Sequence, residues 1–115
     1  MKKTSASPDA WHREYDRLRK GLAQIGYISQ GSVLDRASLR PPRSGYQWTR
    51  KVAGKTITVA LTSQQFSALS QAVQNERKLW QTIRKMENLS RRILFEDQPH
   101  TRRRKHLSNK VLGLV

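Results

Sequence analysis

The side chains that could carry acid–base or metal chemistry are few and scattered along this 115-residue chain. It has three histidines, eight acidic residues and no cysteine. His12 and Asp16 share a helix face at a spacing common for surface pairs, whereas Glu14 lies roughly 200° around the helix from His12. Glycine-rich phosphate loops and the H-E-x-x-H and G-x-S-x-G motifs do not occur. We therefore expect no enzyme, with no catalytic residue, no metal site and no cofactor.

Basic side chains are the dominant feature. Lys and Arg number 23 against 8 Asp and Glu, so the net charge is +15 and the pI is near 11.3. Such an excess repels itself unless a polyanion neutralises it, and the usual polyanions are DNA, RNA and anionic lipid. Apolar runs are too short to span a membrane, and polar residues replace the apolar part of a signal peptide. We expect a nucleic-acid partner, no membrane, and a cytoplasmic, nucleoid-associated location, which the missing cysteine fits.

In two parts of the chain the positive charge has no acid beside it. Residues 36–75 contain no acid. A second, short block lies near the C-terminus, in a stretch that has no acid from Gln98 onward. Neutralised phosphates supply sequence-independent affinity for nucleic acid. We expect phosphate contacts from Arg40, Arg43 and Lys55, and clamping or steering from Arg102, Arg103, Arg104 and Lys105.

The stretch that positions the first group reads as a β-hairpin. The sequence YQWTRKVAGKTITVAL, from Tyr46 to Leu61, alternates in both arms around a turn at Ala53-Gly54. Pairing Val52 with Lys55 gives the hairpin two different faces. One face can cover a core and holds Tyr46, Trp48, Val52, Ile57, Val59 and Leu61, with Arg50 and Lys55 near the turn. The other is small and hydrogen-bonding, has no acid, and holds Gln47, Thr49, Lys51, Thr56, Thr58 and Ala60.

The second face has two interpretations. Threonine is simply a good strand residue, so an ordinary half-solvated sheet explains it. A small sheet can also enter the major groove, where glutamine reads adenine, Lys or Arg reads guanine, and threonine methyls meet the thymine methyl. The basic setting favours the second interpretation, and the candidate nucleic-acid-binding residues are Arg36, Arg40, Arg43, Gln47, Thr49, Lys51, Lys55, Thr56, Thr58 and Arg102 to Lys105.

Aromatic residues distinguish between kinds of nucleic acid. Single-strand binding needs exposed rings on which bases stack. Trp11, Tyr15, Trp48 and Trp80 all fall on faces that we expect to be apolar and packed. These positions favour a duplex or folded RNA over unstacked single strands. We expect duplex DNA as the partner, with RNA possible.

Two helices are expected around the hairpin. Ser7-Pro8-Asp9 is typical of a helix start, and Gly26 is the expected stop of the amphipathic helix that follows. Thr62 and Gln65 fit a capping box that opens a helix of roughly thirty residues before Pro99. Its second half extends beyond the needs of a small core, so we expect it to pack on the first helix, another chain or a second copy through Leu79, Trp80, Ile83, Met86 and Leu89.

The remaining segments complete the predicted fold. Partial alternation over Gly31–Leu39 predicts a first strand, and the Pro-Pro stretch of residues 40–45 predicts a basic loop. The fold class is α+β: an N-terminal amphipathic helix, a small antiparallel sheet of two to three strands, a long C-terminal helix and a basic tail. We predict a disordered arm over residues 1–7, a single nucleic-acid-binding domain over 8–97 and a flexible tail over 98–115.

Four pieces of the segment from Ile28 to about Leu94 carry a resemblance to known proteins: Gly31 to Arg36 (GSVLDR), Gly45 to Val52 (GYQWTRKV), Gly54-Lys55-Thr56 and the helix after Thr62. With these pieces the segment resembles a family of short, uncharacterised prokaryotic domains often encoded in or beside transposable elements. The resemblance implies a small sheet followed by a long helix, a mobile-element context and no known activity. Many family members carry a cysteine-rich loop between the first two strands. Residues 38–44 replace that loop here, so zinc-like stabilisation is not implied.

Three functions are compatible with these features. The first is a non-enzymatic DNA-binding accessory protein of a mobile element, acting in transposition. Three strands followed by a helix are also similar to the arm-binding domains of integrases, which lay a sheet in the major groove, although this is an analogy of fold alone. The second function is an RNA-binding subunit of a ribonucleoprotein. The third is an adaptor whose long helix packs on a partner chain.

Overall fold

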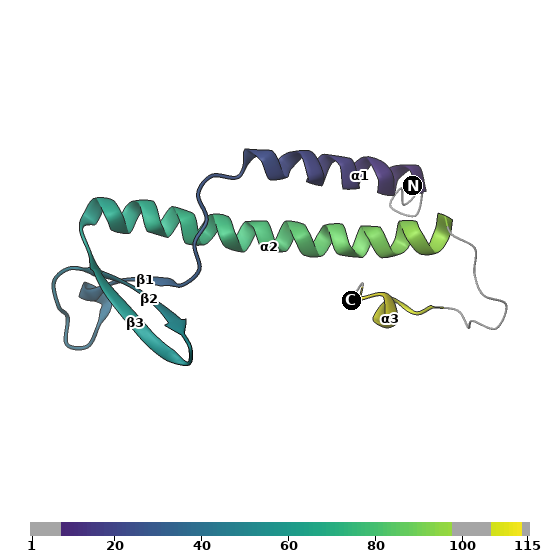
Figure 1. Ribbon diagram of the computed structural model, residues 1–115. Coiled ribbons are helices and arrows are strands. Elements are labelled where there is room, and N and C mark those ends of the chain that lie inside the picture. The colour runs from purple at the N-terminus through teal and green to yellow at the C-terminus, as the bar shows by residue number, and fades with distance from the viewer. Residues whose placement is uncertain (1–7, 98–106, 114–115) are drawn as a thin grey trace. The chain divides into compact units, whose positions relative to one another are not determined.

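A computed structural model describes residues 8–97 and 107–113 of the chain (Figure 1). It confirms the predicted α+β class, with a helix, an antiparallel sheet and a long helix in that order. Short 3₁₀ turns, labelled η, separate some of these elements. In chain order the elements are α1 (Pro8–Gly21), η2 (Leu22–Gln24), β1 (Ser32–Asp35), η3 (Arg36–Ser38), β2 (Tyr46–Val52), β3 (Lys55–Leu61), α2 (Ser63–Asp97) and α3 (Asn109–Leu112).

The chain divides into two compact units. We call residues Ile25–Leu79 the sheet unit, and Met1–Gln24 together with Trp80–Val115 the helical unit. The helix α2 contributes its first half to the sheet unit and its second half to the helical unit. The single domain expected over residues 8–97 stays a prediction, and the predicted arm of residues 1–7 lies outside the described residues.

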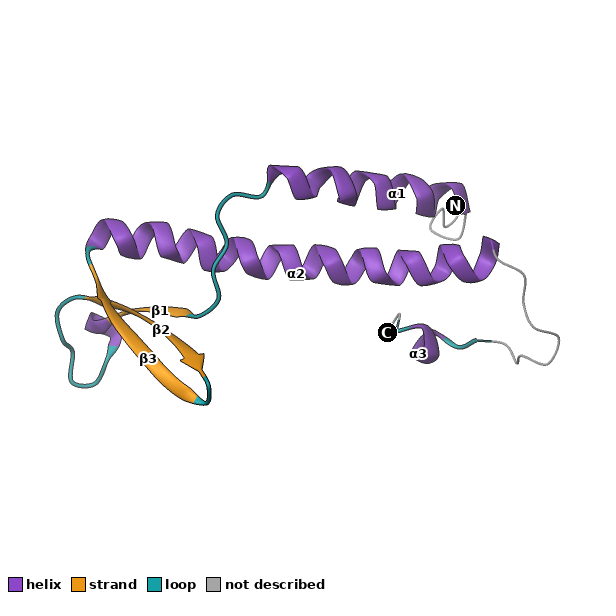
Figure 2. Ribbon diagram, in the orientation of Figure 1, coloured by secondary structure: helices purple, strands orange, loops and turns teal. Residues whose placement is uncertain are grey.

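The sheet has three antiparallel strands in the order β1-β2-β3 (Figure 2). The predicted hairpin register is confirmed, because Val52 pairs with Lys55 and Tyr46 pairs with Leu61. Ala53 and Gly54 have φ angles of 52° and 80°. Positive φ at both central residues is what a two-residue type I′ hairpin turn requires. The turn therefore sets the pairing of the whole hairpin.

The first strand is shorter than the segment predicted over Gly31–Leu39. It ends at Asp35 because the side chain of this residue turns back to the main chain and accepts the Ala37 N–H at 3.0 Å. The Ser38 hydroxyl donates to the Asp35 carbonyl at 2.8 Å. Such local bonds compete with a strand ladder, so Asp35 ends β1 and caps η3.

The first half of α2 covers only part of the apolar sheet face. Tyr46 stacks on Phe66 with ring centroids 4.4 Å apart, which confirms that α2 packs on this end of the hairpin. Ala72 and Val73 of α2 are buried. Ile57 and Val59, nearer the turn, remain 41% exposed. The helix therefore does not cover the whole apolar face that the alternation predicted.

The start and length of α2 follow the sequence closely. The Thr62 N–H donates to Gln65 Oε1 at 2.9 Å, and the Gln65 N–H donates to Thr62 Oγ1 at 3.1 Å. This reciprocal pair is the predicted capping box. The helix then continues for 35 residues, to Asp97.

The helical unit is held by contacts between α1 and the second half of α2. Leu18 of α1 is buried, and the Arg92 guanidinium lies 5.7 Å from the centre of the Trp11 ring. The predicted stop of the first helix at Gly26 is wrong, because α1 ends at Gly21 and tightens into the 3₁₀ turn η2. None of the helices in the described parts of the chain is long and apolar enough to cross a membrane.

A short helical turn, α3, lies within the tail that we predicted to be flexible. Ser108 caps it through a 3.3 Å bond from the Val111 N–H, and Gly113 ends it in the left-handed conformation, with φ at 76°. Residues 108–113 thus have local structure. Residues 98–106 and 114–115 lie outside the described residues.

Candidate nucleic-acid interface

Pairing of the three strands brings one polar face together. In the register of the sheet, Thr49 lies between Ser32 and Thr58. Side chains of residues directly opposite each other share a face of the sheet, so these three form a row of hydroxyl groups. Next to it lie the rows Leu34–Gln47–Ala60 and Lys51–Thr56. We call this surface of eight residues, which carries no carboxylate, the polar face.

The loop between β1 and β2 is held by its own backbone. The Arg36 N–H donates to the Gly45 carbonyl at 2.9 Å, which closes the loop at its base. The Arg36 carbonyl accepts from the N–H groups of Leu39 and Arg43 at 3.1 and 3.0 Å. The exposed side chains of Arg40 and Arg43 therefore extend from an ordered loop at one end of the sheet.

Arg36 and Gln47 are directly connected. Arg36 Nε donates to Gln47 Oε1 at 3.1 Å in a half-buried bond. The bond uses one lone pair of the amide oxygen and leaves the other, along with both N–H donors of the amide. Gln47 is thus oriented with acceptor and donor sites still available, which is the combination that reads adenine.

The hairpin turn carries cations on both faces of the sheet. Lys51 belongs to the polar face, whereas Lys55 lies opposite Val52 and shares the other face with Arg50. The Arg50 guanidinium lies 5.8 Å from the centre of the Trp48 ring. Trp48 is itself held by a 3.0 Å bond from its Nε1 to the Gln30 carbonyl. Trp48 therefore has a structural role, as its position on the apolar face predicted.

The sheet unit has a large excess of positive charge. The unit contains eight Lys and Arg residues and two acids, Asp35 and Glu76. The Asp35 carboxylate caps η3. In the described part of the chain, no salt bridge involves Arg40, Arg43 or Lys51. These cations keep their charge available for an external anion.

The structure brings six of the nine described nucleic-acid-binding candidates to one surface and adds two residues to it. Leu34 and Ser32 of β1 were missed, because the partial alternation of the segment predicts a strand without its register. Arg40 and Arg43 lie at the loop end of the sheet, and Lys55 lies at the turn on the opposite face. The block from Arg102 to Lys105 lies outside the described residues. The residues gathered on the polar face or beside it are Arg36, Gln47, Thr49, Lys51, Thr56 and Thr58.

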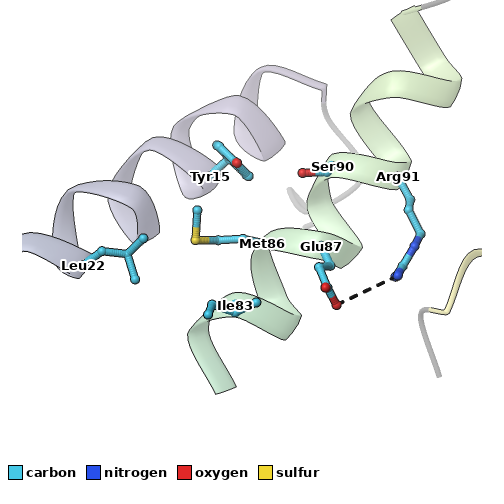
Figure 3. A pocket seen from close by; sticks show the side chains of 7 residues that line it. All are labelled: Tyr15, Leu22, Ile83, Met86, Glu87, Ser90 and Arg91. Atoms are coloured by element: carbon cyan, nitrogen blue, oxygen red, sulfur yellow. Dashed lines mark ion pairs between the residues drawn. The ribbon is translucent and has the colours of Figure 1, made fainter. Parts of the chain in front are cut away.

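The predicted partner-binding residues of α2 contact their own chain in part. Ile83 and Met86 line an open pocket of about 380 Å³ in the helical unit, together with Tyr15 and Leu22 (Figure 3). Packing on the first helix was one of the predicted alternatives for this stripe. Leu79 and Leu89 are half-buried, whereas Trp80 is 49% exposed.

Comparisons with known proteins add no family. No family model, no curated protein and no solved structure matches the chain. The resemblance to domains of mobile elements thus stays a prediction. Within residues 8–97 and 107–113, no group of three or more His, Cys, Asp or Glu side chains could hold a metal ion.

Proposed function

We propose that this protein is a non-enzymatic DNA-binding accessory protein whose polar face enters the major groove of duplex DNA. The observation that carries the proposal is the polar face itself: eight residues without a carboxylate, with unpaired cations at both ends of the sheet. A basic tail from Arg102 to Lys105 adds affinity for any sequence.

The dimensions of the sheet fit this arrangement. Three strands spaced about 4.8 Å apart are roughly 10 Å across, less than the groove width of about 12 Å. β2 has seven residues, which at about 3.4 Å per residue separate its ends by roughly 20 Å. Strands that run along the groove then place Arg40 and Arg43 at one end of the contact and Lys51 at the other, where each group meets the flanking phosphates. The neutral hydroxyl row between them meets the base edges.

A mobile-element context is part of the proposal and rests on sequence resemblance alone. The motif GSVLDR spans β1 and the first residue of η3, and GYQWTRKV covers β2 and the glycine before it. Both resembling motifs therefore lie on the elements that make up the polar face and its loop. In such an element, the protein would help a recombination enzyme to find or hold its DNA ends.

The test is a change on the polar face with a charge-matched control. A duplex selected from a random library by the wild-type chain provides the preferred site. Thr49→Val combined with Lys51→Gln should lower the ratio of preferred-site to random-duplex affinity roughly tenfold or more, because each base contact contributes about 1–3 kcal/mol. Lys78→Gln removes the same charge from α2 and should leave the ratio unchanged.

Two further measurements separate the alternatives. Replacing Arg102 to Lys105 with glutamine should weaken binding to every duplex equally and reduce the salt dependence. Affinities for duplex DNA, single-stranded DNA and structured RNA at two salt concentrations test the kind of nucleic acid. Tighter binding to structured RNA at both salts would overturn the DNA proposal in favour of a ribonucleoprotein subunit. If the folded Thr49→Val, Lys51→Gln variant keeps the sequence preference of the wild-type chain, the polar face is not the surface that reads the DNA.

A further inference from the structure

The outer edge of β3 lacks the features that normally protect an edge strand. β3 is the last strand in the sheet order, and among the described residues no strand lies on its outer side (Figure 2). Six of its seven residues are exposed. Its pairing with β2 is continuous and therefore free of bulges, and residues 56–61 contain no charge, proline or glycine. Natural edges are guarded by charges, prolines or bulges, so this edge is competent to pair with another strand.

The hairpin turn determines which backbone groups point to this edge. A two-residue turn closes on a hydrogen-bonded pair, which here is Val52 and Lys55. Hydrogen-bonded and non-hydrogen-bonded pairs alternate along an antiparallel ladder. Ile57, Val59 and Leu61 therefore bond to β2 like Lys55. The N–H and C=O groups of Thr56, Thr58 and Ala60 point outward.

We propose that β3 pairs antiparallel with β3 of a second copy of this chain, about a twofold axis at Thr58. In this register, Thr58 lies opposite Thr58 of the second copy, and Thr56 lies opposite Ala60. All the outward N–H and C=O groups of these three residues then meet partners. A twofold interface must be self-complementary. The outer edge of β3 meets this condition, because a twofold rotation about Thr58 places the outward N–H and C=O groups of one copy opposite those of the other.

The same register covers the apolar side chains that α2 leaves exposed. It places Ile57 opposite Val59 of the second copy, and Val59 opposite Ile57. Both residues are 41% exposed in the single chain and lie on the face opposite to the polar face. Cross-strand pairs of β-branched residues are among those that stabilise sheets. Pairing with a second copy therefore buries apolar surface at two equivalent contacts, each between Ile57 of one copy and Val59 of the other.

The charge on β3 itself does not oppose this pairing. The only charged residue of β3 is Lys55, at the end of the strand, and it lies opposite the uncharged Leu61 of the second copy. The two Lys55 residues are then separated by the length of the strand, roughly 20 Å. This exceeds the Debye length of about 8 Å at physiological ionic strength. The neutral stretch between them is thus the part of the sheet unit at which two copies can approach.

Pairing through β3 joins the two polar faces into one surface. The hydroxyl row of Ser32, Thr49 and Thr58 continues into the same row of the second copy, in the reverse order. The twofold axis then predicts inverted repeats in the preferred DNA site. This consequence rests on the proposed function, whereas the pairing itself does not.

The first test removes one outward N–H group. Thr58→Pro deletes that donor without touching the β2–β3 ladder, and proline is tolerated at such positions of edge strands. Thr58→Ser keeps the donor and is the control. In sedimentation equilibrium of the full chain at physiological salt, we expect a monomer–dimer equilibrium. Thr58→Pro should raise the dimer dissociation constant roughly 10- to 100-fold, because both copies lose a bond, and Thr58→Ser should leave it unchanged.

The second test uses the predicted neighbours across the axis. Ile57→Lys with Val59→Lys places like charges opposite each other and should abolish the dimer. Ile57→Lys with Val59→Glu places opposite charges opposite each other and should retain it. Both pairs replace the same exposed apolar residues, so a loss of folding affects them alike and is detected by circular dichroism. Equal dimerisation of the two variants would overturn the register.

The outcomes for pairing and for DNA binding can be told apart. A wild-type chain that stays monomeric at about millimolar concentration overturns the pairing, and the edge is then solvated or meets a strand of another protein. DNA binding by such a monomer would leave the proposed function intact. A dimer that is sensitive to Thr58→Pro but binds no nucleic acid would support the pairing and overturn the proposed function.

Discussion

Arginine is used differently in the two units of this protein. In the helical unit, Arg17 and Arg19 form ion pairs with Glu14 and Asp16, one turn away on α1. Arg91 of α2 approaches Glu87 in the same way, at 3.9 Å. In the sheet unit, two arginines contact neutral groups: Arg36 binds Gln47, and Arg50 lies over Trp48.

The difference follows from where the acids lie. Six of the eight acidic residues belong to the helical unit, and three of them, Glu14, Asp16 and Glu87, pair with an arginine one helical turn away. The sheet unit has two acidic residues, and the carboxylate of Asp35 caps η3. An exposed ion pair contributes little to stability, but it reduces the charge that an arginine offers to a phosphate. This difference supports the proposal that the sheet unit binds a polyanion.

The largest expected difference between the units concerns backbone space at glycine. A Cβ at Gly31, where φ is +108°, would lie 2.4 Å from Trp48 Nε1 and 2.6 Å from the Thr49 carbonyl oxygen. Gly31→Ala should therefore destabilise the sheet unit by about 2–4 kcal/mol. Gly21→Ala, at the end of α1, meets nothing within 4 Å and should change stability by at most about 1 kcal/mol. Urea denaturation of both variants measures the contrast, and equal losses would contradict it.

The second prediction concerns the use of charge. Arg40→Gln with Arg43→Gln should reduce the slope of log affinity against log salt for duplex DNA by about 1.8, because two phosphate contacts are lost. Arg17→Gln with Arg19→Gln removes the same charge from α1, where both arginines are paired. This control should reduce the slope much less. Fluorescence anisotropy titrations over a salt series measure both, and equal slopes would mean that binding follows net charge alone.

The smallest expected effect is the pH dependence of the ion pair on α1. The hydrogen bond from Arg17 lowers the pKa of Glu14 from its ordinary value of 4.5. A folded-state pKa below the unfolded value stabilises the fold above the unfolded pKa, and this contribution is lost as pH falls through the folded pKa. For this exposed pair it is a few tenths of a kcal/mol.

NMR measurement of the Glu14 carboxyl chemical shift tests this prediction. The titration runs from neutral pH to about pH 2, a range that spans the ordinary Glu pKa. Arg17→Gln should raise the Glu14 pKa toward its ordinary value. Arg13→Gln, which removes an α1 charge outside the pair, should shift it less. A Glu14 pKa that does not respond to Arg17→Gln would show that the pair is not formed in solution.

The sequence by itself determined the features that depend on neighbouring residues. The turn at Ala53-Gly54 and the alternation of its two arms predict the hairpin register, because a two-residue turn leaves only one pairing that puts the apolar residues on one face. The start of α2 follows from Thr62 and Gln65, which satisfy each other's backbone donors within one turn. The absence of acids from residues 36–75 is likewise visible in the sequence.

Only the tertiary structure decided how β1 completes the polar face. A loop of residues 36–45 separates β1 from β2, and such a loop does not set a register as a two-residue turn does. Ser32 therefore reaches Thr49 through long-range pairing, and Arg36 reaches Gln47 because the loop closes at Gly45. The exposure of Ile57 and Val59 also depends on where α2 packs, which periodicity cannot specify. Local hydrogen bonding thus predicts the hairpin, whereas the full polar face and the open edge of β3 arise from packing between distant segments.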